Sequence, residues 1–447
     1  MKLSGNIRHI SSFQIIILGF FSVVMLGTIL LMLPFATVGP KGASFIDALF
    51  TSVSATCVTG LILNSTVEYW SVFGQIVILC LIQIGGMGVV TIAISIAMVS
   101  GRKISLMQRS TMQEAISAHQ VGGIVKMTNF IFKTVLIIEL VGALCLAPTF
   151  CKEYGVKGIW YALFHSVSAF CNAGFDLLDH ADGSISLMHY VGNPFINLPI
   201  MLLIILGGIG FLNWDDIRQN RFRIKKYRMQ TKMVLLMTLI ILVLSSLYFF
   251  FFEFSRGVWD MTFVERLLAS MFQSVTPRTA GFNTVDLTNM TDVSKLITIV
   301  LMLIGGASGS AAGGFKINTL AVLLMTLWAV FHHRQEIHSF GRRLAPQSVF
   351  NAIAIFMMYI ILFLIGGIIV SVAESAPLLD ALFEAASAIG TVGSSLGLTS
   401  NLTILSKWVL VLLMFFGRVG GLTLIFAVIS EKHPLFSKYP EDKMTVG

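Results

Sequence analysis

The sequence predicts an all-α membrane protein built from four repeats of helix, re-entrant segment and helix. The first observation behind this prediction is composition: of 447 residues, 56% are hydrophobic and only 12% are charged, and the mean hydropathy is +0.86. This composition provides too little polar surface for a water-soluble globular protein. We therefore place the chain in a bilayer. The second observation is a residue pattern that recurs four times along the chain.

Eight apolar runs are long enough to cross about 30 Å of hydrocarbon, which takes roughly 20 helical residues. They cover residues 13–34, 71–99, 127–150, 193–213, 232–254, 293–330, 349–373 and 404–430. The first run follows Lys2 and Arg8 but has spanning length, and no small-residue cleavage pattern follows it. We therefore expect it to be a retained helix and not a signal peptide.

Lysine and arginine are distributed unequally between the connecting segments. Nineteen lie on the side that holds residues 1–12 and 431–447, and seven lie on the other side. Because basic loops stay in the cytoplasm, we expect both termini to be cytoplasmic. The net charge of +8 then reflects contact with anionic membrane lipid and gives no argument for nucleic acid. Docking of a cytoplasmic partner on the basic loop 214–232 stays open as an alternative.

Enzymatic chemistry has no visible support in the sequence. The five cysteines are odd in number and have no CxxC or histidine-paired spacing, which argues against a disulfide framework or a metal site. There is no phosphate-binding loop and no dinucleotide fingerprint. We therefore expect a protein that is not an enzyme and that carries no covalent cofactor.

The strongest signal is internal repetition. Residues 48–60 and 162–174 are identical at nine of thirteen aligned positions. A third copy, one residue shorter, ends at residue 281, and a fourth covers 381–393. The four copies end in Gly60, Gly174, Gly281 and Gly393, which stand 114, 107 and 112 residues apart.

The second half of each repeat also recurs, as an apolar run with a glycine cluster. The clusters lie at 85–88, 207–210, 305–309 and 417–421, which sets the repeats at 13–99, 127–213, 232–330 and 349–430. Apolar segments of 10–14 residues are too short to span and suit re-entrant helices. Irregular backbone at membrane depth is tolerated where protein buries it or water lines it. We therefore predict four helix–pore loop–helix repeats, with eight transmembrane helices and four re-entrant pore helices around one pore.

The terminal glycines suit a ring of backbone carbonyls. Carbonyls that replace the hydration shell of an ion need φ angles of alternating sign, and glycine adopts positive φ without steric cost. The preceding short helices direct their partially negative C-termini at the same place, which favours a cation. Any one of these glycines could serve helix packing instead, but four in register indicate a common function.

These motifs resemble the Trk/Ktr/HKT superfamily of potassium transporters, and within it the transmembrane subunits of bacterial Ktr systems. The stretches that carry the resemblance are 54–61, 170–175, 276–283, 390–393 and 417–420. The resemblance implies potassium uptake across the bacterial plasma membrane, with K⁺ held at the four terminal glycines. The implied filter consists of Cys57, Val58, Thr59, Gly60, Asn172, Ala173, Gly174, Thr279, Ala280, Gly281, Thr391, Val392 and Gly393. Asn172 could coordinate the ion or brace its loop.

The resemblance also implies partners. It implies a homodimer with one pore per protomer, a cytoplasmic ring of nucleotide-binding regulatory subunits (KtrA-like), and Na⁺ as an activator. In this family a filter serine in the first repeat accompanies sodium transport, so Gly60 is consistent with potassium. Two alternatives remain open: a sodium-coupled potassium symporter and a non-catalytic subunit of an ATP-driven potassium pump.

The third repeat departs from the others at residues 305–316, a run of small residues with five glycines. An α-helix does not favour such a run, and about a dozen residues at 1.5 Å each place it near mid-membrane. We expect an uninterrupted helix at the same place in the other repeats. The resemblance assigns an intramembrane gating loop here, although the proline frequent in the Trk branch is absent. The expected gate residues are Gly305, Gly306, Ala307, Ser308, Gly309, Ser310, Gly313, Gly314, Lys316 and Arg418.

Ionisable residues at membrane depth are costly and usually functional. We expect Lys316 and Arg418 to hold or release the segment 305–316. Arg278 and Glu384 are predicted to form a buried pair, and Glu139 is predicted to be a hydrogen-bonded structural acid. Asp47 and Asp380 lie near the starts of pore segments, where an acid favours the helix N-terminus.

Overall fold

The computed structural model describes residues 11–39, 42–100, 104–116, 123–178, 186–334, 336–421 and 423. These residues are mostly helical, and the strands within them form one short antiparallel hairpin, β1 (His338–Ser339) and β2 (Arg342–Arg343). The predicted all-α class is therefore confirmed. The predicted tail 431–447 and most of the N-terminal segment 1–12 lie outside the described residues.

Each repeat begins with a long apolar helix. These helices are α1 (Ser12–Leu31), α7 (Ile124–Tyr154), α11 (Met229–Tyr248), which continues into a π-helical turn η4 (Phe249–Glu253), and α15 (Pro346–Glu374). All four are long and apolar enough to cross a membrane, and only 28–33% of each apolar window is buried inside the protein. The remaining apolar surface needs a lipid environment.

A short helix follows in each repeat. The four are α2 (Phe45–Thr56), α8 (Lys157–Cys171), α12 (Phe263–Val275) and α16 (Leu378–Gly390). Each runs inward from the protein surface: in α2, Phe45 is exposed and every residue from Ala48 to Thr56 is buried. At 12–15 residues they are too short to span a bilayer, as expected of re-entrant segments.

The second helices of repeats 1 and 2 are interrupted, which corrects the expectation of an uninterrupted helix there. The helical pieces are α4 (Val72–Met87) with α5 (Val89–Val99), α9 (Pro194–Ile209) with α10 (Phe211–Asn220), α13 (Asp292–Leu303) with α14 (Ile317–Phe331), and α17 (Ile404–Val419). In repeat 4, α17 ends at Gly420, and most of the chain that follows lies outside the described residues. Gly88 and Gly210 bend the first two pairs by 96° and 94°. Their φ angles are +87° and +94°, and Gly420, which ends α17, has +88°. Positive φ stops helical hydrogen bonding, and glycine adopts it at no steric cost.

Short elements connect these helices. They are α3 (Thr66–Tyr69), α6 (Leu106–Ile116) and the 3₁₀ turns η1 (Pro34–Ala36), η2 (Met188–Tyr190), η3 (Ile224–Lys226), η5 (Leu287–Asn289) and η6 (Thr399–Asn401). By length and composition, the described residues contain four membrane-spanning helices, or up to six if each bent pair counts as one span. The predicted arrangement of eight spanning and four re-entrant helices therefore stays a prediction.

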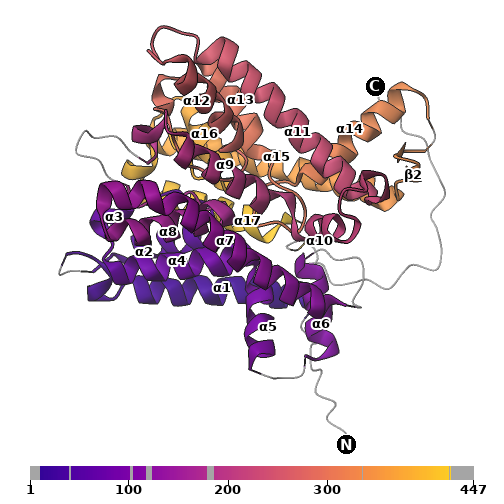
Figure 1. Cartoon of the computed structure of the whole chain (residues 1–447), viewed down its shortest axis with the longest axis horizontal. Helices are drawn as coiled ribbons and strands as arrows, with labels where there is room; N and C mark the ends of the chain where they lie inside the picture. Colours follow the sequence, from indigo (N-terminus) through magenta and orange to yellow (C-terminus); the bar gives the residue numbers. More distant parts are fainter. Residues whose placement is uncertain are drawn as a thin grey trace, which may run out of the picture.

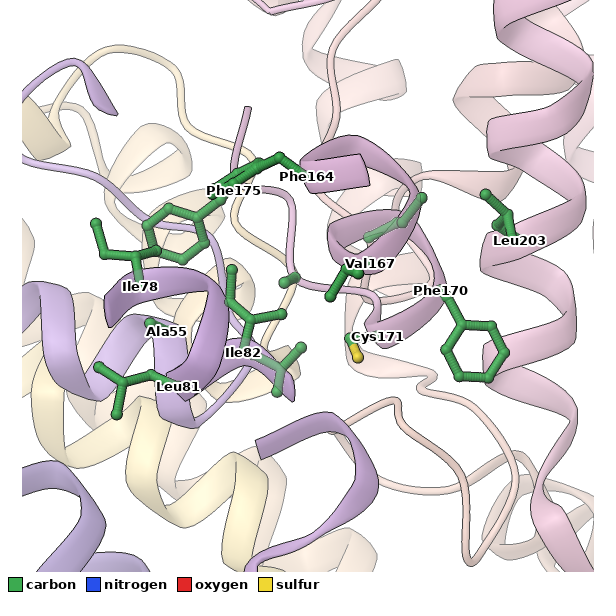
Figure 2. Close-up of a cluster of buried hydrophobic side chains, with 14 of the residues drawn as sticks. Ala55, Ile78, Leu81, Ile82, Phe164, Val167, Phe170, Cys171, Phe175 and Leu203 are labelled. Carbon is green, nitrogen blue, oxygen red and sulfur yellow. The ribbon is translucent and has the colours of Figure 1, made fainter. Parts of the chain in front are cut away.

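The repeats pack around a shared interior. Figure 1 shows α1, α2 and α4 along one side of the molecule and α11 to α13 along the other, with α17 between them. One hydrophobic cluster joins repeats 1 and 2: Ile78 and Ile82 of α4 face Val167 and Phe175 of the second repeat (Figure 2). This packing places α4 of repeat 1 against the re-entrant helix α8 of repeat 2, and the loops that follow the re-entrant helices meet inside the protein.

Candidate ion pathway

The four terminal glycines form a closed ring, named here the glycine ring (Gly60, Gly174, Gly281 and Gly393). A β-carbon on any of them would overlap backbone of the next repeat. The overlapped carbonyls belong to Ala173 for Gly60, Ala280 for Gly174, Val392 for Gly281 and Thr59 for Gly393. The contacts thus run from repeat 1 to 2, 3 and 4 and back to 1. The structure brings together all four loops that the sequence singled out.

The loop backbones share one conformation. The ring glycines have φ of +92°, +68°, +79° and +96°, and the residues two positions earlier have +58° (Val58), +60° (Asn172), +73° (Thr279) and +52° (Thr391). The residue between them lies outside the positive region in every loop. This is the alternation that a carbonyl-lined ion path requires. A non-glycine residue at positive φ costs roughly 1–2 kcal/mol, and such strain is characteristic of functional sites.

A hydroxyl at an equivalent position, in or just after the last turns of each re-entrant helix, holds the loop that follows. Ser54 and Ser387 accept hydrogen bonds from the ring N–H groups of Gly60 and Gly393, at 3.1 and 3.0 Å. Ser168 and Thr276 instead donate to carbonyls just beyond the ring, those of Phe175 and Phe282, both at 2.7 Å. We did not predict these residues, although a hydroxyl at the same place in all four copies was a readable signal.

Asn172 links the loops of repeats 2 and 3. Its amide oxygen accepts from the Thr279 hydroxyl at 3.0 Å when its nitrogen donates to the carbonyls of Ala169 and Ile204, each at 3.2 Å. In this orientation protein groups satisfy both ends of the amide. The geometry favours the bracing role over ion coordination.

The glycine clusters of the second helices lie against the ends of the re-entrant helices. β-Carbons at Gly85, Gly207 and Gly417 would overlap the carbonyls of Thr56, Phe170 and Ile389. These carbonyls occupy the same position in repeats 1, 2 and 4. The missing side chains therefore let each second helix pass directly behind its own loop.

Residues 305–316, named here the intramembrane segment, form a loop with a closed base. The Gly305 N–H donates to Phe315 at 2.9 Å, and the Ile317 N–H donates to Gly306 at 3.1 Å. A β-carbon at Gly313 would overlap the Thr391 side chain, so the segment lies against the fourth loop, two residues before its ring glycine. The predicted break in the third repeat is present: α13 has 12 residues, about 18 Å at 1.5 Å per residue.

The second repeat holds the segment through backbone hydrogen bonds. Ala307 and Ala311 donate to the carbonyls of Gly208 and Gly207, at 2.8 and 3.1 Å. In return, the Phe211 N–H donates to Gly309 at 2.8 Å. These acceptors and donors are free because the helix of repeat 2 breaks at Gly210. The bend and the segment therefore form one structural unit.

Arg418 and Lys316 both bind carbonyls of the segment, as expected. The Arg418 guanidinium donates to Ala311 and to Gly85 of repeat 1, and reaches Gly86 at 3.3 Å. The Lys316 Nζ donates to Ala312 at 2.6 Å. Within the described residues neither cation has a carboxylate partner. Arg418 therefore ties repeats 1 and 4 to the segment.

A cavity of about 240 Å³ adjoins the segment. The segment, Lys316 and Arg418 line it together with the breaks at Gly88 and Gly420 and with Glu114 of α6. Elements of all four repeats meet there. We did not predict a contribution of α6 to this cavity.

The predicted pair of Arg278 and Glu384 is wrong. The Glu384 carboxylate accepts from the hydroxyls of Ser395 and Thr399, at 2.5 and 2.6 Å, and from the Leu396 N–H at 3.1 Å. Arg278 is buried, and its Nε has no hydrogen-bond partner. The acid fastens the chain beyond Gly393, because hydroxyl and N–H donors of its own loop lie within reach.

Glu139 is a hydrogen-bonded buried acid, as expected. Its carboxylate accepts from the Gln83 amide at 3.1 Å and lies 3.8 Å from the Cys171 thiol. Gln83 belongs to the second helix of repeat 1, and Cys171 ends the re-entrant helix of repeat 2. Glu139 therefore stabilises the junction of these repeats behind the glycine ring.

Asp47 and Asp380 form ion pairs between repeats that the sequence did not reveal. Lys407 contacts Asp47, and Lys295 contacts Asp380, each at 3.0 Å. Both acids are the third residue of a re-entrant helix, and both lysines are the fourth residue of the second helix of the preceding repeat. At the equivalent junction of repeats 1 and 2, the Trp160 indole donates to Gln75 at 3.0 Å.

The junction of repeats 2 and 3 differs. The equivalent residue, Asn197, donates to the carbonyls of Tyr190 and Val191 in its own repeat, at 2.8 and 2.9 Å. Its amide oxygen is buried without a hydrogen-bond partner. Three of the four junctions therefore carry the polar bridge among the described residues.

Fold and site together define a membrane protein in which four similar repeats surround one axis and present a ring of strained backbone loops. The family model described as "TrkH: Cation transport protein" matches residues 4–438. The chain belongs to this family of cation transport proteins.

Named relatives cover nearly the whole chain. The chain is 38% identical to the "Potassium/sodium uptake protein NtpJ" of Enterococcus hirae, over 98% of each protein. It is 39% identical to the "Ktr system potassium uptake protein B" of Bacillus subtilis, over 97% of this chain and 96% of that protein. It is also similar to the crystal structure of the potassium transporter TrkH from Vibrio parahaemolyticus, with a TM-score of 0.72, 20% identity, and coverage of 96% and 87% of the two chains. That likeness supports the fold.

Proposed function

We propose that this protein takes up potassium across the bacterial plasma membrane and that the glycine ring is its selectivity filter. The observation that carries the proposal is the closed cycle of four loops with positive φ at both Gly and Gly−2. Four such loops supply carbonyl oxygens from four sides, which is how a protein replaces the water around a potassium ion. Relatives at 35–39% identity are named as potassium or potassium/sodium uptake proteins.

The driving force is the membrane potential. A negative interior draws a cation inward with about 2.3 kcal/mol per charge per 100 mV, so a selective path needs no further energy source. The orientation with cytoplasmic termini, inferred from the lysine and arginine distribution, directs the basic loops toward the interior. K⁺ is the transported ion and occupies the ring transiently.

The intramembrane segment is the gate in this proposal. It lies against the fourth loop, its base is closed, and Lys316 and Arg418 bind its carbonyls. A gate needs two positions separated by a few kcal/mol, so that a regulator can shift their populations. Small residues keep the barrier between such positions low. The gate residues are those expected from the sequence, from Gly305 to Lys316 together with Arg418.

The regulator in the proposal is a separate cytoplasmic subunit. Several relatives are named as components of a Ktr system, and the sequence shows no nucleotide-binding fingerprint of its own. A KtrA-like ring of nucleotide-binding subunits would therefore contact the basic loops of a homodimer of this chain. Any effect of ATP or ADP on flux enters through that partner.

The second candidate function involves sodium as well as potassium. The Enterococcus hirae relative is named for both potassium and sodium, which supports either activation by Na⁺ or sodium-coupled symport. Symport needs a second ion site with side-chain carboxylates at mid-depth. The candidate there, Glu139, has its carboxylate occupied by Gln83 and Cys171, so the channel-like mechanism is favoured.

Purified protein in lipid vesicles tests the proposal. We expect potassium uptake that follows an imposed potential, with potassium preferred over sodium, and without any ATPase. Measurement with and without a sodium gradient separates the candidates: a fixed stoichiometry of sodium to potassium would replace the channel-like mechanism with symport. Copurification of a P-type ATPase that is required for uptake would instead support the pump-subunit alternative. A Gly60→Ser protein, in which we expect the preference for potassium to be reduced, is measured in parallel.

A further inference from the structure

A basic cavity lies at the ends of several membrane helices, away from the glycine ring. Its volume is about 840 Å³, within the range of about 300–1,000 Å³ for small-molecule sites. Its walls come from the start of α7, from α10, from the start of α11 and from strand β2 with the residues that follow it. In Figure 1, α10 and β2 lie on the side of the molecule opposite to α3.

Cationic side chains dominate the lining. They are Lys126, Arg218, Arg228, Arg342 and Arg343, against the single carboxylate of Asp215. Asp215 is already bound by the Gln219 amide at 2.6 Å, and Arg343 by Glu336 at 2.5 Å. Among the described residues, the side chains of Lys126, Arg228 and Arg342 have neither a hydrogen bond nor an ion pair. The cavity therefore holds positive charge that the protein does not neutralise.

The floor of the cavity is apolar. Ile124 and Leu212 are buried, Met127 and Phe130 are half-buried, and the Arg218 guanidinium stacks on the Phe130 ring at 4.5 Å. Farther along, the same helices expose large apolar side chains, such as Ile137 of α7 and Leu239 of α11. A free anion gains little from such a floor, whereas an amphiphile can use both the charge and the apolar surface.

The position of the cavity indicates which kind of amphiphile binds there. Three of the four long apolar helices, α7, α11 and α15, begin at or beside it. Helix ends mark the level of lipid headgroups, and the basic side is the cytoplasmic one. We propose that this cavity binds the phosphate headgroup of an anionic phospholipid of the inner leaflet, with its acyl chains against the exposed apolar faces of α7 and α11. Basic pockets between membrane helices suit such headgroups.

Native mass spectrometry of the full-length protein tests this site. The detergent-solubilised protein receives equal amounts of phosphatidylglycerol and phosphatidylcholine, and the ratio of the two bound lipids is measured. We expect Arg218→Gln with Arg342→Gln to lower that ratio by about 25-fold, since one cation near the surface contributes about fivefold. Arg223→Gln with Arg334→Gln removes two exposed arginines outside the cavity and serves as the matched control, with the ratio close to that of the parent.

Four results would overturn the proposal. One is an unchanged lipid ratio in the cavity variant, which should elute as a folded protein because its substituted side chains are exposed. A second is an equal loss in the control, which would indicate diffuse charge. The third is displacement of the lipid by inorganic phosphate at matched concentration, which would indicate a free-anion site. A defect confined to binding of a soluble cytoplasmic subunit would likewise replace the lipid with a protein partner.

Discussion

The four repeats are alike at the glycine ring but differ from one another in the layer directly behind it. At the ring, all four loops share one backbone conformation, although Val58, Asn172, Thr279 and Thr391 differ at the strained position. Behind it, two second helices bend at glycines, one gives way to the intramembrane segment, and one ends at Gly420. In the function proposed above, symmetry is kept where four carbonyls would face one ion and is absent where a single element would obstruct the path.

The largest effect should follow from breaking the ring itself. Gly60→Ser introduces a β-carbon that overlaps backbone of Ala173 and Gly174, so two neighbouring ligand positions shift. We expect the preference for potassium over sodium to fall about a hundredfold, or roughly 1.4 kcal/mol for each displaced position. The ratio of potassium to sodium uptake in vesicles measures it.

Gly397→Ser is the matched control for the ring. Gly397 also has positive φ, at +94°, but a β-carbon there meets nothing within 4 Å. It carries the same backbone strain without the overlap, so selectivity should stay at the parent value. A Gly60→Ser protein of normal abundance and normal selectivity would refute the filter assignment.

The asymmetric layer can be tested by removing its distinctive element. Deletion of residues 307–312 eliminates the hydrogen bonds to Gly207 and Gly208 and the Arg418 contact, and it spares both bonds that close the base. We expect potassium flux without any regulatory subunit to rise about tenfold, equivalent to a shift of ~1.4 kcal/mol in the gate equilibrium. Selectivity should be preserved. A deleted protein that inserts normally yet conducts no faster would place the gate elsewhere.

A smaller effect is expected from a change at Asn172, at the boundary between the glycine ring and the layer behind it. Asn172→Leu removes the link to Thr279 and leaves the buried Thr279 hydroxyl without this acceptor, which should cost about 1–3 kcal/mol of stability. A fluorescence melting curve of the purified protein measures the loss. Thr56→Val is the control, because the buried Thr56 hydroxyl has no partner to lose. Equal melting temperatures for the two variants would argue against the brace.

The smallest effect is expected at the outer ion pairs. Lys407 and Asp47 keep side-chain exposures of 18% and 24%, so solvent screens their attraction, and the pair should contribute about 0.5 kcal/mol. A double-mutant cycle with Lys407→Met and Asp47→Asn should give a coupling energy of that size that shrinks in high salt. A coupling several times larger would mean that the pair is essential to ring closure.

Much of the ring could be predicted from the sequence, because its glycines recur in aligned copies and positive φ has a known residue preference. The place of the intramembrane segment followed from composition in the same way. The bends at Gly88 and Gly210 could not be predicted, because glycine in an apolar run serves helix packing as readily as a break. Whether such a glycine serves packing or a break depends on the carbonyls of the re-entrant helices beside it.

The polar contacts between repeats were harder to predict from the sequence. Arg278 and Glu384 occupy neighbouring repeats, and opposite charge alone suggested a pair; the local donors Ser395 and Thr399 satisfy the acid instead. Lys407 and Asp47 are 360 positions apart, and only the cyclic order of the repeats brings them together. The role of the ring as a potassium filter stays a prediction, since geometry alone does not identify the ion.

The contact between the first and last repeats has a consequence for biosynthesis. Gly393 meets Thr59, and Lys407 meets Asp47, so the first repeat finds its second neighbour only when the last helix has been made. Until then, the loop of repeat 1 has a partner on one side only. A chain that stops before the fourth repeat would leave the loop of repeat 1 uncovered on one side, and polar backbone at membrane depth is costly where protein does not bury it.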